Sequence, residues 1–257
     1  MFKRSLVLLY GVVCYVAFLV AFLYAIGFVS NFLVPHSIDS VPDGDFIGSL
    51  LTDLALLTIF AIQHSVMARP AFKRWWTRFI PEVAERSTYV LAASLALILL
   101  YAYWRPLGGI VWNVDGPVSA AMLYGLCAFG FLLVLVSTFL INHFDLFGLR
   151  QVWLYFIGKP YRPIGFRTPG PYRMIRHPLY AGFLFAFWAT PVMSIAHLVF
   201  AIATTVYILV AIQLEEHDLV ASLGEAYRDY RKHVPMLIPF AGTRASRVAE
   251  ATSAIKH

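Results

Sequence analysis

The chain has 257 residues, of which 60% are hydrophobic and only 13% are charged, and its formal net charge is +6. Soluble domains carry about 25% charged residues, so the composition excludes an ordinary soluble protein and predicts a polytopic membrane protein built from apolar helices. The basic residues lie mainly in the loops between those helices, where they reflect membrane topology. We therefore expect no nucleic-acid partner.

Charge-poor intervals predict the membrane spans in chain order. A span needs about 20 apolar residues to cross a bilayer core of ~30 Å. One span each fits the intervals Ser5–Phe32, Phe46–Ala68, Ser87–Trp104 and Pro117–Asn142. The next interval, Pro178 to Leu214, contains no Asp, Glu, Lys or Arg, and as a single helix it would reach about 55 Å. We expect it to form two short spans that turn near Ser194–His197, which gives an all-α bundle of about six transmembrane helices.

The basic residues predict the orientation of this bundle. Cytoplasmic loops retain Lys and Arg, and with the N-terminus inside, all but one of the 20 basic residues are cytoplasmic. The exception is Arg105, in a short, turn-rich outer loop. We therefore expect both termini to be cytoplasmic.

Composition also predicts the domain organisation. We expect one membrane domain over residues 1–240 and a small, polar, disordered tail over 241–257. Cys14 and Cys127 fall in different predicted spans, so we expect buried structural thiols and no disulfide. The long cytoplasmic segment from His143 to His177 is rich in Gly and Pro, but its aromatic and basic residues argue against disorder. After Glu216 we expect an amphipathic helix, broken at Gly224 and ending before Val234-Pro235.

Polar residues gather at the predicted cytoplasmic ends of the spans. Ionisable groups at such positions are costly to desolvate, so a group of them at one depth indicates a functional site. These residues are Gln63, His64 and Ser65 on the second span, Asn142, His143 and Asp145 at the fourth, Arg176, His177 and Tyr180 at the fifth, and Glu215 and Glu216 at the sixth. Asp53 is an exception, because it lies deeper, toward the outer half of the second span.

Several kinds of chemistry are excluded by missing motifs. The chain has no Gly-x-Gly-x-x-Gly or Walker sequence and no Gly-x-Ser-x-Gly elbow. Its histidines lack the spacing of a zinc site, so we expect no metal. What remains is a polar cytoplasmic pocket with both signs of charge and an apolar floor, which suits a zwitterionic cofactor and a hydrophobic substrate.

The polar residues suggest how such a cofactor would be held. Arg176 or His177 suits a carboxylate, and Glu215 or Glu216 suits an ammonium group or ribose hydroxyls. Aromatic rings attract cations and pack on purines, and glycine permits close backbone approach. The aromatic candidates are Tyr172 and Tyr180. The glycine candidates are Gly170 and Gly182.

The last third of the chain carries a family pattern at these residues. Its elements are Arg176-His-Pro-Leu-Tyr-Ala-Gly182, Glu215-Glu-His-Asp-Leu219, Gly224-Glu-Ala-Tyr-Arg-Asp-Tyr230 and Val234-Pro235. In this order they resemble the isoprenylcysteine carboxyl methyltransferase superfamily, whose members are membrane enzymes that use S-adenosylmethionine. The resemblance implies that residues 165–240 wrap this cofactor. The implied cofactor-binding residues are Gly170, Tyr172, Arg176, His177, Pro178, Tyr180, Gly182, Glu215, Glu216 and Tyr227.

A narrower resemblance covers earlier segments as well. Gln63–Pro70, Glu85–Leu91, Ile141–Val152 and Gly165–Gly170 are similar to those of bacterial membrane enzymes that methylate methanethiol to dimethyl sulfide. The resemblance implies the same reaction at the cytoplasmic face of a bacterial inner membrane, with a small volatile thiol and membrane lipid as partners.

A thiol acceptor requires a base, because the thiolate is the better nucleophile. His64 and His143 are the candidates by type and predicted depth, with Asp145 or Ser65 orienting an imidazole. Gln63, Ser65 and Asn142 are the candidate substrate-binding residues.

Other functions remain open at this stage. The acceptor is alternatively another small thiol or a lipid-derived nucleophile, and the wider superfamily also contains sterol reductases that use NADPH. A non-enzymatic alternative is a haem-binding or transport protein that uses the intramembrane histidines and Asp53. The sequence does not give the oligomeric state.

Overall fold

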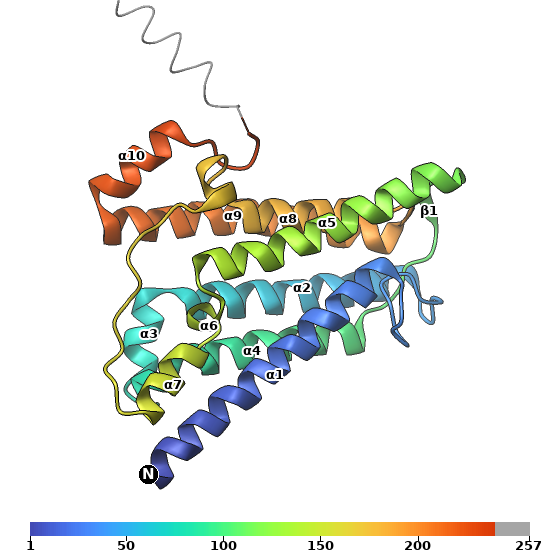
Figure 1. Cartoon of the computed structure of the whole chain (residues 1–257). Helices are drawn as coiled ribbons and strands as arrows, with labels where there is room; N and C mark the ends of the chain where they lie inside the picture. The colour runs from blue at the N-terminus through green and yellow to red at the C-terminus, as the bar shows by residue number, and fades with distance from the viewer. Residues whose placement is uncertain (240–257) are drawn as a thin grey trace, which may run out of the picture.

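A computed structural model describes residues 1–239 as a bundle of long helices that run side by side (Figure 1). Within these residues, five helices are long and apolar enough to cross a membrane. They are α1 (Phe2–Ser30), α2 (Phe46–Ala68), α4 (Glu82–Tyr103), α5 (Pro117–Ile141) and α9 (Ile195–Leu223). The chain is therefore a multi-pass, all-α membrane protein, as expected. The tail expected over 241–257 lies outside the described residues.

The expected pair of short spans is replaced by one short and one long helix. Helix α8 (Pro178–Trp188) has 11 residues and rises only about 16 Å, too little to cross the bilayer alone. It ends early because Thr190 precedes Pro191, which disfavours helical backbone and has no N–H for the Phe187 carbonyl. The Nε2 of His197 binds that carbonyl instead, at 2.9 Å. The turn therefore lies over residues 189–194, slightly before its expected place.

Short helices gather at the end of the bundle that holds the N-terminus (Figure 1). These are α3 (Pro70–Trp76), α6 (His143–Leu146), α7 (Leu149–Phe156), the 3-10 turn η1 (Gly170–Arg173) and α10 (Glu225–His233). The segment from 143 to 177 thus contains helical structure. The helix expected after Glu216 continues α9, and the expected break at Gly224 is confirmed, with φ 62° and ψ −133° at that residue.

The opposite end of the bundle is fastened by hydrogen bonds. Strands β1 (Ile110–Asn113) and β2 (Val192–Ser194) pair there in antiparallel fashion. The Asp53 carboxylate accepts a bond of 2.8 Å from the Arg105 amide, and Trp104 donates to the Ile38 carbonyl at 3.2 Å. Asp53, the deep polar residue of α2, therefore helps to hold the loop that begins at Arg105.

Helices α5 and α8 make the tightest contact that positions the site. A Cβ atom built on Gly182 would lie 2.7 Å from the Gly130 carbonyl oxygen, and one built on Gly130 would lie 2.6 Å from the Gly182 oxygen. Only glycine allows this backbone approach. Cys14 and Cys127 are buried and free, which confirms their expected structural role.

Candidate functional site

The Arg-His-Pro segment at the start of α8 binds the Glu216 carboxylate of α9. Arg176 donates from Nε to Oε1 at 2.6 Å, and His177 Nε2 lies 3.0 Å from the same oxygen. Arg231 of α10 approaches the other oxygen at 3.6 Å. Glu216 is 4% exposed and His177 5%, so this is a buried charge cluster with its partners in place.

The same segment also fastens the chain after α10. The backbone amides of Arg176 and His177 donate to the carbonyls of Pro235 and Met236, at 2.8 and 3.2 Å. The Arg176 guanidinium adds a bond of 2.5 Å to the Val234 carbonyl. The Val-Pro element of the sequence pattern is thus held against the Arg-His-Pro element by main-chain hydrogen bonds.

Glu215 has a different environment from its neighbour. Its side chain is 43% exposed, and its carboxylate lies 3.9 Å from His177 Nδ1. The charge of this carboxylate acts on the hydroxyl of Tyr180, and Tyr207 and Tyr89 act on the same hydroxyl. The charge of Glu215 also acts on the hydroxyl of Tyr172. Glu215 is therefore an accessible carboxylate among tyrosines drawn from several elements.

The tyrosines of η1 and α10 remain neutral at physiological pH. Burial, and after it the charge of Glu215, raises the pKa of Tyr172. Burial, and after it the charge of Glu216, raises the pKa of Tyr227. Each hydroxyl is consequently a hydrogen-bond donor, and each ring is an uncharged face beside a carboxylate.

His64 lies in an aromatic cluster next to Glu215's tyrosines. The Tyr89 hydroxyl of α4 lies 2.8 Å from His64 Nε2, and the Phe60 ring stacks on the imidazole at 5.2 Å. Tyr207 meets it edge-on at 6.5 Å and receives a hydrogen bond of 3.4 Å from Ser65. Tyr89 and Tyr207 also act electrostatically on Tyr180, and this links the His64 cluster to Tyr180 and Glu215.

His143 is separate from this cluster. Its Nε2 bonds the Tyr15 hydroxyl at 2.7 Å and its Nδ1 bonds the Thr138 hydroxyl at 2.8 Å. The ring stacks on Phe139 at 4.2 Å and contacts Phe147 at 4.8 Å. Both nitrogens are therefore used in fixing α6 to α1 and α5.

Asn142 and Asp145 also serve local structure. Asn142 caps α6 by accepting the Asp145 amide at 3.1 Å, and its own φ is 144°. The Asp145 carboxylate pairs with Arg150 at 2.8 Å and accepts from Tyr161 at 3.2 Å. These contacts hold together the segment that follows α5.

Gly170, Pro178 and Gly182 shape the start of α8. Gly170 has φ +51°, a conformation that favours glycine. Pro178 occupies the first turn of α8, where its missing N–H has no cost. Gly182 faces α5, and its small size allows the close packing of the two helices there.

Several residues of the site were not identified from sequence. Tyr89 and Tyr207 bound the His64 cluster, and Arg69 bonds both Asp218, at 2.9 Å, and the Leu214 carbonyl, at 3.1 Å. Tyr207 could have been predicted from the sequence, because it lies two helical turns before Glu215 and on the same side of an otherwise apolar helix.

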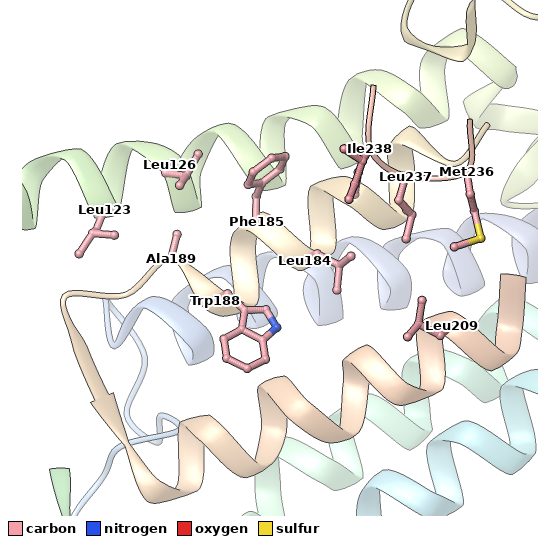
Figure 2. A pocket seen from close by; sticks show the side chains of 11 residues that line it. Leu123, Leu126, Leu184, Phe185, Trp188, Ala189, Leu209, Met236, Leu237 and Ile238 are labelled. Atoms are coloured by element: carbon pink, nitrogen blue, oxygen red, sulfur yellow. The ribbon is translucent and has the colours of Figure 1, made fainter. Parts of the chain in front are cut away.

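An apolar groove of about 710 Å³ runs beside α8. Figure 2 shows Leu126 of α5, Leu184 and Phe185 of α8, and Leu209 of α9 along it, with Ile238 from the chain after α10. Its size suits an acyl chain, and its lining offers few groups for catalysis.

Comparisons with known proteins extend over nearly the whole chain. The family model described as NnrU protein matches residues 54–256. A methanethiol S-methyltransferase of Crocosphaera subtropica is 58% identical over 95% of this chain and 95% of its own length. One of Mycobacterium tuberculosis is 54% identical over 93% and 98%. Nurim of Mus musculus is 33% identical over 70% of this chain and 71% of its own. No solved structure matches.

Proposed function

The chain belongs to the NnrU protein family, together with the bacterial methanethiol S-methyltransferases, and from this membership we propose that it methylates methanethiol to dimethyl sulfide. We further propose S-adenosylmethionine as the methyl donor and the cytoplasmic face of a bacterial inner membrane as the place of reaction. The structural observation that supports the donor is the accessible Glu215 carboxylate, whose charge acts on tyrosines at the end of the bundle that holds the N-terminus.

The residues present fit such a donor. Gln63, next to His64, has a buried Oε1 without a hydrogen-bond partner among residues 1–239, so it is free to accept from a ligand. Glu215 supplies negative charge, and the rings of Tyr172, Tyr180 and Tyr227 supply uncharged faces that attract a sulfonium. When bound, S-adenosylmethionine supplies a methyl group on a positively charged sulfur, which departs with the bonding electron pair.

Glu215 and Glu216 take different parts in this proposal. Glu215 binds the ammonium group or the ribose hydroxyls, because its side chain is 43% exposed. Glu216, Arg176 and His177 act as positioning residues, because their charged groups are already bonded to each other and to the chain after α10. Gly170 and Pro178 set the path of the backbone beside them.

His64 is the proposed general base. An imidazole that is neutral near pH 7 can accept the thiol proton, while the sulfur of methanethiol forms its new bond to the methyl carbon. Tyr89 holds the imidazole through its hydroxyl, and Ser65 and Gln63 flank it. The main contribution of the site is to keep the two sulfurs aligned and away from water.

A headspace assay with methanethiol and S-adenosylmethionine tests the reaction. The wild-type chain should release dimethyl sulfide, and its absence would reject the acceptor. In the same preparation, Glu215→Gln should weaken S-adenosylhomocysteine binding by about tenfold, the loss of one charged contact. His64→Gln should lower kcat by about a hundredfold, within the range for a general base, with S-adenosylhomocysteine binding retained.

His143→Gln is the matched control for the base. It should leave kcat near the wild-type value, because its nitrogens are bonded to Tyr15 and Thr138. If His143→Gln abolishes turnover and His64→Gln does not, the roles proposed for the two histidines are reversed. Binding of NADPH, or a haem absorption band, without S-adenosylhomocysteine binding would favour the other functions.

A further inference from the structure

A small cavity lies between α2 and α9, on the outer side of the His64 cluster. Its volume is about 120 Å³. Leu54, Phe60 and Ala61 of α2 form one wall, and Ala203, Thr204 and Tyr207 of α9 form the other. It adjoins the proposed site without sharing the residues assigned to the donor.

The two threonine hydroxyls of this lining are used within their own helices. The Thr58 hydroxyl donates to the Leu54 carbonyl at 2.7 Å, and the Thr204 hydroxyl donates to the Phe200 carbonyl at 2.6 Å. Both donors are thus satisfied within their own helices. A ligand here would need little hydrogen bonding, and a polar one would lose its bonds to water without replacement.

The volume of the cavity limits the ligand to a few heavy atoms. An apolar cavity of about 150 Å³ binds benzene, so one of about 120 Å³ admits smaller molecules and excludes long chains. Methanethiol, with one carbon and one sulfur, is well within this limit. The groove beside α8, at about 710 Å³, would not distinguish it from larger apolar compounds.

The lining of the cavity extends from an exposed residue of α2 to two aromatic neighbours of His64. At ~1.5 Å per residue, Leu54 and Ala61 lie about 12 and 23 Å along α2 from its outer end, within the hydrocarbon. Leu54 is 40% exposed on that face. At the other end, Phe60 stacks on His64 and Tyr207 meets its edge.

We propose that this cavity is the acceptor site, and that a small apolar thiol reaches His64 through it from the bilayer rather than from the cytoplasm. The inference rests on the proposed methyl transfer and adds to it an access route and a size limit. A volatile thiol is apolar enough to partition into hydrocarbon, so the donor and acceptor would approach His64 from opposite sides.

The test is to fill the cavity in protein reconstituted into liposomes. Ala203→Leu should raise the KM for methanethiol by about tenfold or more, because a single misfitted methylene changes discrimination on that scale, while S-adenosylhomocysteine binding stays unchanged. Leu54→Ala, which widens the opening, should increase activity on 1-butanethiol relative to methanethiol. Ala61→Val, from the opposite wall, repeats the filling test if the leucine disturbs the fold.

Matched controls place equal bulk elsewhere. Ala55→Leu, on the exposed face of α2, and Leu126→Trp, in the groove of Figure 2, should both leave the KM unchanged. An active wild type whose KM is unaffected by Ala203→Leu and Ala61→Val overturns the acceptor site and leaves methyl transfer standing. A wild type that forms no dimethyl sulfide overturns the proposed function, and this inference with it.

Discussion

Glu215 and Glu216 are adjacent on α9 but point in different directions, so they have different surroundings. Successive residues of a helix are turned by about 100°, so Glu216 faces Arg176 and His177 while Glu215 faces the tyrosines. The sequence pattern predicts that these carboxylates meet the Arg-His-Pro segment. It does not predict which one does so, because that depends on the rotation of α9 against α8.

Glu216→Gln should destabilise the fold. The change leaves the largely buried Arg176 side chain, 11% exposed, without its full charge partner, and removing one member of a buried pair costs about 3 to 5 kcal/mol. The free energy of unfolding, measured in mixed detergent micelles, should fall by that order, whereas Glu215→Gln should leave it near the wild-type value. Equal losses for the two variants would contradict the distinct environments.

His143 should make stability depend on pH. Burial lowers the pKa of His143, which lies in α6 beyond the end of α5. The unfolded chain then binds a proton more readily, so stability is present above pH ~6.5 and is lost as pH falls through the folded-state pKa. The wild-type melting temperature should drop between pH 7 and pH 5. His143→Gln should show a smaller drop, and an identical pH profile would refute the assignment.

At the scale of elements, the charge map predicts the long helices well and α8 poorly. Phe46–Ala68 has the same bounds in sequence and structure, because the charges and turn residues around it mark both ends. No charge marks the end of α8, which depends on Pro191 and on the imidazole of His197 reaching back to Phe187. The separation of His143 from His64 likewise depends on how α6 packs. Their similar predicted depth does not tell whether the two side chains lie close together.

The contact between α5 and α8 should be sensitive to a single methyl group. Gly182→Ala would place a carbon 2.7 Å from the Gly130 oxygen and 2.9 Å from the Val134 nitrogen, forcing the helices apart at a cost of about 1 to 3 kcal/mol. Gly125→Ala on α5 meets nothing within 4 Å and should be neutral or stabilising, since alanine favours helix. Detergent unfolding of both variants compares them directly, and similar effects would contradict close packing at Gly182.

At the scale of the whole molecule, many of the basic residues and the short helices lie at the same end of the bundle. The loops rich in Lys and Arg carry α3, α7 and α10, and the proposed site lies among them (Figure 1). Positive charge is retained on the cytoplasmic side during insertion. The proposed orientation therefore places the proposed site on the side where S-adenosylmethionine would be available.

Labelling of introduced cysteines should verify this orientation. Both native thiols are buried, so they give little background. Val41→Cys, in the loop after α1, should react with a membrane-impermeant maleimide in spheroplasts. Lys159→Cys, in the loop after α7, should react only after the membrane is opened. The reverse pattern would show that the N-terminus is outside.

The length of helix α9 sets the depth of Glu215 in the bilayer. It begins at Ile195, directly after strand β2, and the rise from there to Glu215 is ~30 Å, close to the thickness of the hydrocarbon core. The carboxylate thus reaches the boundary between acyl chains and headgroups by length alone. A thicker bilayer would place the carboxylate in hydrocarbon, and a thinner one would place it in water. The proposed activity should therefore depend on the match between bilayer thickness and the length of α9.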